Sequence, residues 1–162
     1  SCCILFYFNF NIYINIVINI LKIMNKEFEQ ISIKPGFMKH NGGLLFKTIS
    51  ENEYQFKTTI KENHLNAAGI AHGGFIAAVV DAGAGTAAHR VADGSSCVTI
   101  SLELKFISTV KLGQELVVVT KIQKKTKSMI FLTCELKTEN KIVATASGIW
   151  KKVKLSRSVS ES

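Results

Sequence analysis

The feature that most constrains this chain is an unbroken run of small and apolar residues in its middle, GGFIAAVVDAGAGTAAHRV, at residues 73–91. The run is rich in alanine, contains no proline and spans about five turns at 3.6 residues per turn, so it predicts one long α-helix. Because the helix is hydrophobic almost all round, surrounding structure must bury it. Gly83 and Gly85 each weaken it by about 1 kcal/mol relative to alanine, so we expect them to mark the close approach of a neighbouring backbone.

Strand patterns flank this helix on both sides. Alternating apolar and polar residues with β-branched content predict two strands before the helix and four after it, at 44–49, 54–60, 97–108, 115–123, 129–137 and 142–153. The short connections favour antiparallel neighbours. In the strand at 97–108, Thr99 is predicted to lie on the face away from the core. The residues of this strand expected to face the core are Val98, Ile100, Leu102, Leu104 and Phe106.

This order of elements predicts an α+β fold in which a six-stranded antiparallel sheet wraps around one long central helix. Residues 26–42, which are broken by Pro35-Gly36 and Asn41-Gly42, are expected to form a short helix or coil and then a turn. One sheet would not fully cover so apolar a helix, so we also expect two copies of the chain to pair.

The folded domain is predicted to span residues 24–154, followed by a disordered tail at 155–162. The 162-residue chain contains one proline and no linker-like stretch that would divide this span. Residues 1–23 are dominated by Ile, Asn and Phe, and we interpret them as a non-native extension, translated from upstream sequence, before a true start at Met24. A membrane anchor or signal and an additional strand are the alternatives, although four asparagines disfavour stable membrane insertion.

The formal net charge of +8 indicates attraction to an anionic partner without naming it. Lysines gather within 124–127 and 151–154, where a solvated surface is the simplest explanation and a phosphate-bearing small molecule is another. These clusters lack the interleaved aromatic residues of a nucleic-acid interface, so no nucleic-acid partner is predicted. The four cysteines form no CxxC pair, which favours a reducing cytoplasm and small core thiols.

Polar residues and glycines concentrate just before and inside the predicted helix. Asp81 lies among valines and alanines, where burying an unpaired carboxylate would cost several kcal/mol, so it is either functional or on a stripe that faces water. Gly73 and Gly74 open the helix, where backbone N–H groups and the helix dipole favour an oxyanion, although glycine is also common structural punctuation there. Asn66, taken alone, is better explained as a turn residue.

The combined spacing of these residues resembles the hotdog-fold thioesterase superfamily, in particular its phenylacetate-degradation type and its medium- and long-chain acyl-CoA relatives. The resemblance extends from about Gly36 to Trp150 and implies hydrolysis of acyl-CoA thioesters without a cofactor. One departure is Thr109, where relatives often carry a proline after the third strand. The residues that carry the match are His64-x-Asn66, Gly69, His72-Gly73-Gly74 and Asp81.

The resemblance also assigns roles to single residues. It implies that Asp81 is the general base or nucleophile, that the Gly73 N–H polarises the thioester carbonyl, and that Asn66 positions substrate or water. Thr99 is expected to supply a hydroxyl from the next strand. In this family the aspartate comes from one subunit and the asparagine and glycine from its partner, so a homodimer, assembled as a dimer of dimers, is expected. The residues predicted to contact substrate are His64, His72 and Gly74.

Other functions are open on the sequence alone. One is a non-hydrolytic acyl-CoA-binding or dehydratase-like hotdog protein, although a dehydratase would pair its carboxylate with a histidine at a different spacing. Another is a basic interaction module in which Asp81 is structural. His64 and His72 lack a third ligand at a familiar spacing, so no metal is predicted.

Overall fold

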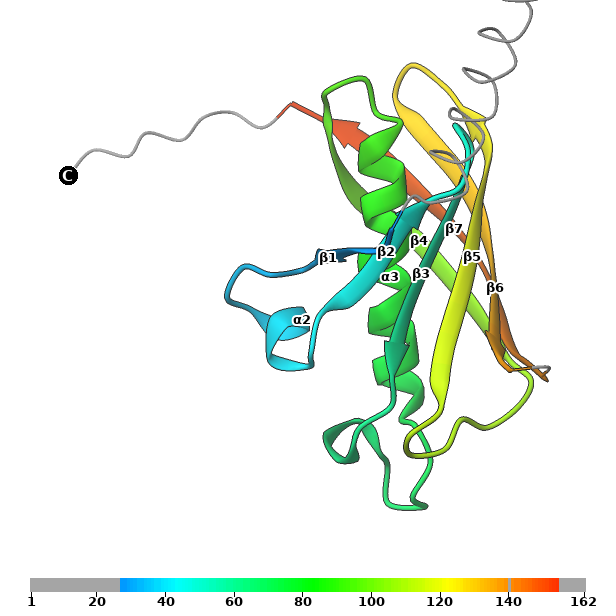
Figure 1. The fold of residues 1–162 in the computed structure, drawn as a ribbon. Helices are drawn as coiled ribbons and strands as arrows, with labels where there is room; N and C mark the ends of the chain where they lie inside the picture. Colours follow the sequence, from blue (N-terminus) through cyan, green and yellow to red (C-terminus); the bar gives the residue numbers. More distant parts are fainter. Residues whose placement is uncertain (1–26, 140, 155–162) are drawn as a thin grey trace, which may run out of the picture.

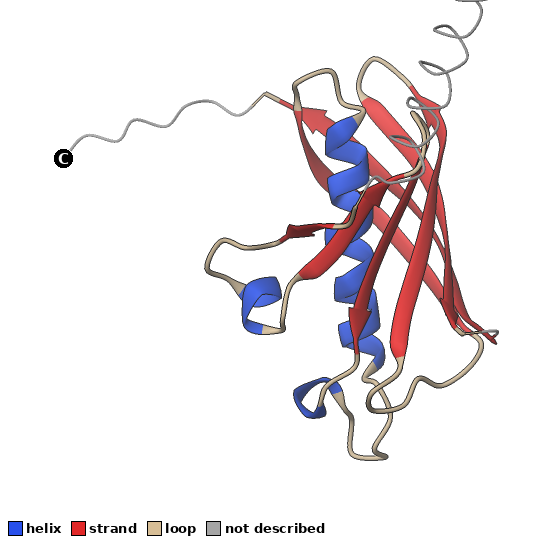
Figure 2. Cartoon of the chain, viewed as in Figure 1, coloured by secondary structure: helices blue, strands red, loops and turns tan. Residues whose placement is uncertain are grey.

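The computed structural model describes residues 27–139 and 141–154, so the interpretations of residues 1–23 and 155–162 concern segments outside the described residues. One long helix, α3 (Gly73–Arg90), lies across one face of a curved sheet (Figures 1 and 2). A short helix, α2 (Phe37–His40), and a 3-10 turn, η1 (Glu62–His64), lie in the connections. The strands are β1 (Glu29–Ile31), β2 (Leu44–Thr48), β3 (Glu53–Thr59), β4 (Ser96–Phe106), β5 (Glu115–Lys125), β6 (Met129–Thr138) and β7 (Lys141–Val153).

The strands follow the spatial order β1-β2-β3-β5-β6-β7-β4, and neighbouring strands are antiparallel. The predicted α+β architecture is therefore confirmed, with the six expected strands and one more. The additional strand is β1, in a region where the sequence indicated only a short helix or coil. Gln30 of β1 lies opposite Leu45 of β2, so β1 forms one edge of the sheet and β4 the other.

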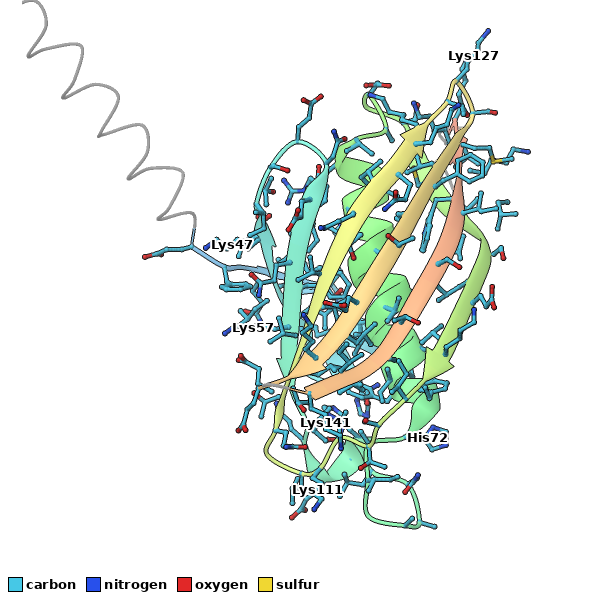
Figure 3. All side chains as sticks on the ribbon, turned by 90° about the vertical axis from the view of Figure 1, so that its right-hand side faces the viewer. Lys47, Lys57, His72, Lys111, Lys127 and Lys141 are labelled. Atoms are coloured by element: carbon cyan, nitrogen blue, oxygen red, sulfur yellow. The ribbon has the colours of Figure 1, made fainter. Side chains whose placement is uncertain are left out.

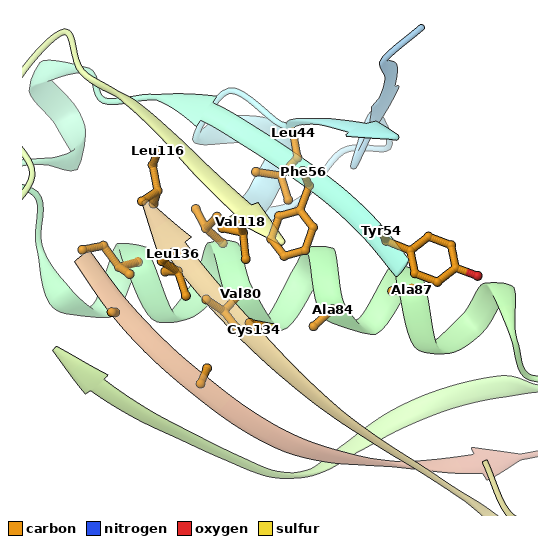
Figure 4. Packing of buried hydrophobic residues seen from close by; sticks show 14 of the residues in the cluster. Leu44, Tyr54, Phe56, Val80, Ala84, Ala87, Leu116, Val118, Cys134 and Leu136 are labelled. Atoms are coloured by element: carbon orange, nitrogen blue, oxygen red, sulfur yellow. The ribbon is translucent and has the colours of Figure 1, made fainter. Parts of the chain in front are cut away.

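One face of α3 packs against the sheet and forms the core. Gly83 lies on this face, where an added Cβ would come within 2.3 Å of the Phe56 ring, and a Cβ on Gly85 would lie 3.3 Å from the Trp150 indole nitrogen. The expected close approach therefore exists at both glycines, but aromatic side chains make it, not a backbone. Figure 4 shows buried side chains between helix and sheet, among them Val80, Ala84, Ala87, Leu44, Val118 and Leu136.

The opposite stripe of α3 is not covered within a single chain. Asp81 and His89 are exposed on it, and Ala82 and Gly85 between them are partly exposed. One sheet therefore covers one face of the helix only, as expected, and the pairing of two copies over the other face stays a prediction. This open stripe carries the carboxylate that the sequence singled out.

A β-bulge in β4 changes which of its side chains face the helix. The pairing of β4 with β7 shifts between Thr99 and Ser101, which makes Ile100 the extra residue. Before the bulge, Cys97 packs toward the core and Thr99 reaches α3, whereas after it Leu102 packs toward the core. One inserted residue thus reverses the alternation along the strand.

The predicted buried face of β4 is therefore wrong at its beginning. Val98 and Ile100 were expected in the core, but they are 46% and 53% exposed. The prediction that Thr99 faces away from the core is also wrong. Because of the bulge, its side chain points toward α3. β4 thus begins as an edge strand with apolar side chains on its outer surface.

Lysine side chains of the two predicted clusters make ion pairs within the chain. Asp93, in the loop after α3, accepts Lys125 Nζ at 2.9 Å and Lys152 Nζ at 3.0 Å. These two hydrogen bonds lower the pKa of the Asp93 carboxyl. Part of the basic sequence therefore ties the ends of β5 and β7 to this loop. Lysines outside the two clusters are spread over the molecule, as Figure 3 shows for Lys47, Lys57, Lys111 and Lys141.

Candidate functional site

His64 anchors the segment that leads into α3. Its buried ring accepts the Lys61 N–H at Nδ1 and donates from Nε2 to the Asn41 carbonyl oxygen, each at 3.0 Å. The His64 ring stacks on Phe75 with centroids 3.7 Å apart, and the His64 backbone carbonyl accepts the His72 N–H at 2.8 Å. Burial lowers the pKa of His64, which favours the neutral ring. His64 thus holds the loop against the helix, and its contact with substrate stays a prediction.

Asn66 forms a side-chain turn that leaves one end of its amide available. Its Oδ1 accepts the N–H of Ala68 at 2.9 Å and that of Ile70 at 3.4 Å. The Asn66 N–H donates to the Ile70 carbonyl at 2.8 Å, which closes the loop. Because Oδ1 faces backbone donors, Nδ2 is the end that can donate to a ligand.

The first turn of α3 presents one uncapped backbone donor. His72 is the N-cap, and its Nδ1 accepts the Gly74 N–H at 2.9 Å. The Phe75 N–H donates to the His72 carbonyl at 2.9 Å. Within residues 27–139 and 141–154, the half-buried Gly73 N–H has no hydrogen-bond partner. At the positive end of the helix dipole, such a donor attracts negative charge. Substrate contact by His72 and Gly74 stays a prediction.

Asn66 and Gly73 line one pocket of about 320 Å³, which we call the donor pocket. The Phe106 ring lines this pocket next to Gly73, since a Cβ built on Gly73 would be 3.4 Å from the ring Cζ. Most of the wall is apolar, and two lining residues, Ser108 and Thr109, carry hydroxyls. Thr109 is the position where relatives often carry a proline. The remaining lining residues are Ile70, Ala71, Ile76, Ile107 and Val110.

Asp81 and Thr99 line a second pocket of about 440 Å³, which we call the carboxylate pocket. Thr99 Oγ1 donates to Asp81 Oδ1 at 2.7 Å, which orients the carboxylate. Both residues are exposed, so Asp81 lies on a water-facing stripe in the single chain. The other lining residues are Ala82, Gly85, Thr86, His89, Cys97, Val98 and Trp150.

The two pockets are separated along α3. Gly73 and Asp81 are eight residues apart, which corresponds to about 12 Å along the axis of a helix. One chain therefore brings Asn66 together with Gly73, and Asp81 together with Thr99, but it does not join the two pairs. Groups that polarise and attack one carbonyl must both come within about 3 Å of it. Neither pocket of a single chain meets that condition.

Two aromatic pocket residues were missed by the reasoning from sequence. Phe106 is assigned to the core by alternation, yet it is 55% exposed because it ends β4, beside the first turn of α3. Trp150 is buried and borders the carboxylate pocket. The one sequence signal for the exposure of Phe106 is its position at the end of the strand, where fewer neighbours cover a side chain.

Metal clusters and reactive thiols do not feature in the part of the chain that the structure describes. No group of three His, Cys, Asp or Glu side chains there could hold a metal ion. Burial raises the pKa of the Cys134 thiol to about 11 and also raises that of Cys97. Neither thiol is therefore a nucleophile near neutral pH. No helix in the same residues is long and apolar enough to cross a membrane.

Known proteins resemble this chain over a segment that includes the whole of α3. The family model described as the thioesterase superfamily matches residues 68–145. An inferred esterase of Pseudomonas aeruginosa is 35% identical over 92 residues, which cover 56% of this chain and 69% of that protein. Acyl-coenzyme A thioesterase 13 of Mus musculus is 27% identical over 112 residues, which cover 68% of this chain and 80% of that protein.

Solved structures share the fold. Thioesterase superfamily member 2 of zebra fish superposes with a TM-score of 0.68 at 20% identity, covering 74% of this chain and 88% of that one. A hypothetical thioesterase of Streptococcus pneumoniae TIGR4, solved with coenzyme A, gives a TM-score of 0.64 at 16% identity, covering 68% and 86%. These likenesses confirm the hotdog arrangement of one long helix against an antiparallel sheet.

Proposed function

We propose that this chain, which belongs to the thioesterase superfamily, hydrolyses acyl-coenzyme A thioesters to a free acid and coenzyme A. One observation carries the proposal: the donors of Asn66 and Gly73 line one pocket, and a carboxylate oriented by a hydroxyl lies on a second pocket of the same helix. The substrate class is supported by one relative that is named an acyl-coenzyme A thioesterase and by one similar structure that contains coenzyme A.

The donor pocket suits the carbonyl oxygen of a thioester. Attack on the carbonyl carbon moves negative charge onto this oxygen, and the Gly73 N–H and Asn66 Nδ2 are the donors that would receive it. A preorganised donor of this kind stabilises the transition state by about 3 to 4 kcal/mol. The dipole of α3 acts in the same direction.

The carboxylate pocket suits the attacking step, by either of two routes. As a general base, Asp81 takes a proton from water, the resulting hydroxide adds to the carbonyl carbon, and the C–S bond breaks as the proton passes to the thiolate. As a nucleophile, an Asp81 carboxylate oxygen adds to the carbonyl carbon and the C–S bond breaks, which forms an acyl–Asp81 anhydride and releases the coenzyme A thiolate. Water then splits the anhydride into the free acid and the Asp81 carboxyl, whose proton passes to the thiolate. Thr99 keeps one carboxylate oxygen engaged in both routes and leaves the other free to react.

A complete site requires both pockets, and we propose that a second copy of the chain joins them. β4 is an 11-residue edge strand that carries exposed apolar side chains, and such edges are usually covered. Pairing of two β4 strands about a two-fold axis runs them antiparallel, so that the beginning of one, at Cys97 to Thr99, lies beside the end of the other, at Phe106. The carboxylate pocket of each copy would then adjoin the donor pocket of its partner. Further assembly into a dimer of dimers stays a prediction.

The test is release of free thiol from a panel of aryl- and alkyl-CoA esters by the full-length chain. We expect hydrolysis of at least one class by the wild type and its near-complete loss in Asp81→Asn. A wild type that binds the esters but releases no thiol would favour the non-hydrolytic acyl-CoA-binding alternative. Full activity in Asp81→Asn would contradict the role given to this carboxylate.

A further inference from the structure

We propose that Phe106 sets the size of the acyl group that the site accepts, because its ring closes the donor pocket beside the Gly73 N–H. This inference rests on the proposed function, since it concerns the same site. Phe106 lies opposite Ala144 of β7 and follows Leu102 and Leu104 on the side of β4 that faces α3. Its ring therefore meets the first turn of the helix.

The contact between Phe106 and Gly73 is close enough to define the space beside the donor. A Cβ on Gly73 would lie 3.4, 3.7 and 3.8 Å from three carbons of the ring. A carbonyl oxygen that accepts the Gly73 N–H must lie within about 3 Å of that nitrogen. The acyl group attached to this carbonyl therefore starts next to the ring, and its first carbons meet Phe106.

Core packing holds two of the other apolar walls of the donor pocket, because Ile76 and Val110 are 3% and 0% exposed. Two walls lie outside the core: Phe106 is 55% exposed and Ile107 is 59% exposed, so replacing either leaves no hole in the core. The three atoms nearest to a Cβ built on Gly73 all belong to Phe106. Its ring is thus the exposed wall that lies against Gly73, and its size can change without altering the fold.

A pocket of about 320 Å³ is small, since ligand pockets range over about 300–1,000 Å³. Its apolar walls suit an uncharged acyl group. With the ring in place, compact acyl groups, including single rings that can stack on Phe106, fit beside the donor better than long straight chains. The same ring therefore disfavours chains that must pass it.

The experiment measures kcat/KM of the full chain for a series of straight-chain acyl-CoA esters from butyryl to palmitoyl, together with one aryl ester. Phe106→Ala enlarges the pocket, and we expect it to raise the ratio of long-chain to short-chain kcat/KM by about tenfold or more. Phe106→Trp narrows the pocket and should lower that ratio. Leu112→Ala is the matched control, because Leu112 is also apolar and 50% exposed but does not line the donor pocket.

Each outcome bears on the inference. Equal change of kcat/KM for every ester in the Phe106 variants overturns it, as does loss of all activity together with dissociation of the dimer in sedimentation, because Phe106 would then be an interface residue only. A wild type inactive on every ester overturns the proposed function, and the inference with it. An active wild type whose chain-length preference Phe106→Ala leaves unchanged overturns the inference alone.

Discussion

The two halves of the candidate site lie on one helix but are held in different ways. In the donor pocket, backbone hydrogen bonds fix the loop of Asn66, and the buried His64 ring fixes the start of α3. The carboxylate pocket depends on a single side-chain bond between Thr99 and Asp81, both exposed. Under the proposed function, the chain by itself preorganises the donors that would stabilise charge. It leaves the proposed attacking group, Asp81, on an open face, where a second copy would complete the site.

Removing the attacking group should have the largest effect. Asp81→Asn keeps the shape of the side chain and the bond from Thr99, but an amide neither accepts the proton nor attacks the thioester. We expect kcat to fall by about 10²- to 10⁴-fold with little change in KM. Steady-state thiol release measures this. The matched control is Asp93→Asn, since Asp93 is an exposed aspartate at φ 56°, a conformation that asparagine also adopts.

Removing a donor from the preorganised half should cost somewhat less. Asn66→Asp keeps the oxygen that accepts the Ala68 and Ile70 N–H groups, so the turn survives while the Nδ2 donor is replaced by a charged oxygen. We expect kcat to fall by about 10²- to 10³-fold. Asn63→Asp, on the exposed turn just before, is the control. Equal losses in both variants would show that the amide is no donor.

Loosening the carboxylate should be a smaller effect. Thr99→Val removes the hydroxyl that orients Asp81, a bond of about 1 to 1.5 kcal/mol, so activity should fall by up to about tenfold. Thr99→Ser keeps the hydroxyl and should retain activity. Thr86→Val is the control in the same pocket, because the Thr86 hydroxyl donates to the Ala82 carbonyl within the helix. Full activity in Thr99→Val would mean that the carboxylate needs no orientation.

The smallest expected effect is the pH dependence of the free energy of unfolding. It tests the buried His64 ring that holds the donor pocket. The folded chain keeps His64 neutral because burial lowers its pKa, whereas the unfolded chain binds a proton below about pH 6.5. The unfolded state then holds more protons, so the free energy of unfolding decreases as pH falls from about 6.5 toward the folded pKa. Urea unfolding between about pH 8 and pH 5 should show this slope in the wild type and a shallower one in His64→Gln, even though that variant is less stable. Equal slopes would contradict the assignment.

Acidic groups do not interfere in that window. The pKa values of Asp93 and Glu103 are lowered by hydrogen bonds from lysines. Carboxyls lowered in this way bind protons in the unfolded state only below about pH 5, so the stability they contribute is lost as pH falls through more acidic values. The His64 slope is therefore measured above them.

Much of the fold follows from composition and apolar alternation, and the errors of prediction have local causes. The helix at residues 73–91 was predictable from its long alanine-rich run without proline, and the six strands were predictable because each alternates over many residues. β1 was missed because three residues with two polar side chains carry no such period, and its pairing with β2 supplies its structure. The bulge at Ile100 was missed because apolar and polar residues alternate without a break from Val98 to Leu102, so the sequence hides the change of face.

The residue types of the site were predictable, whereas their roles depend on three-dimensional contacts. Sequence spacing singled out Asn66, Gly73 and Asp81, but the separation of donors and carboxylate into two pockets emerges only from the helix geometry. A buried, fully bonded histidine such as His64 looks the same in sequence as one that binds substrate. Phe106 was assigned to the core because alternation reports the direction of a side chain and not what covers it.

Complementation between the two halves tests the shared site most directly. Asp81→Asn and Asn66→Asp chains, each nearly inactive alone, are co-expressed in equal amounts so that copies assemble at random. If each site takes its carboxylate from one copy and its donors from another, about a quarter of the sites are fully wild type, and we predict about a quarter of wild-type activity. Activity no greater than the average of the two separate variants would contradict a site built from two copies.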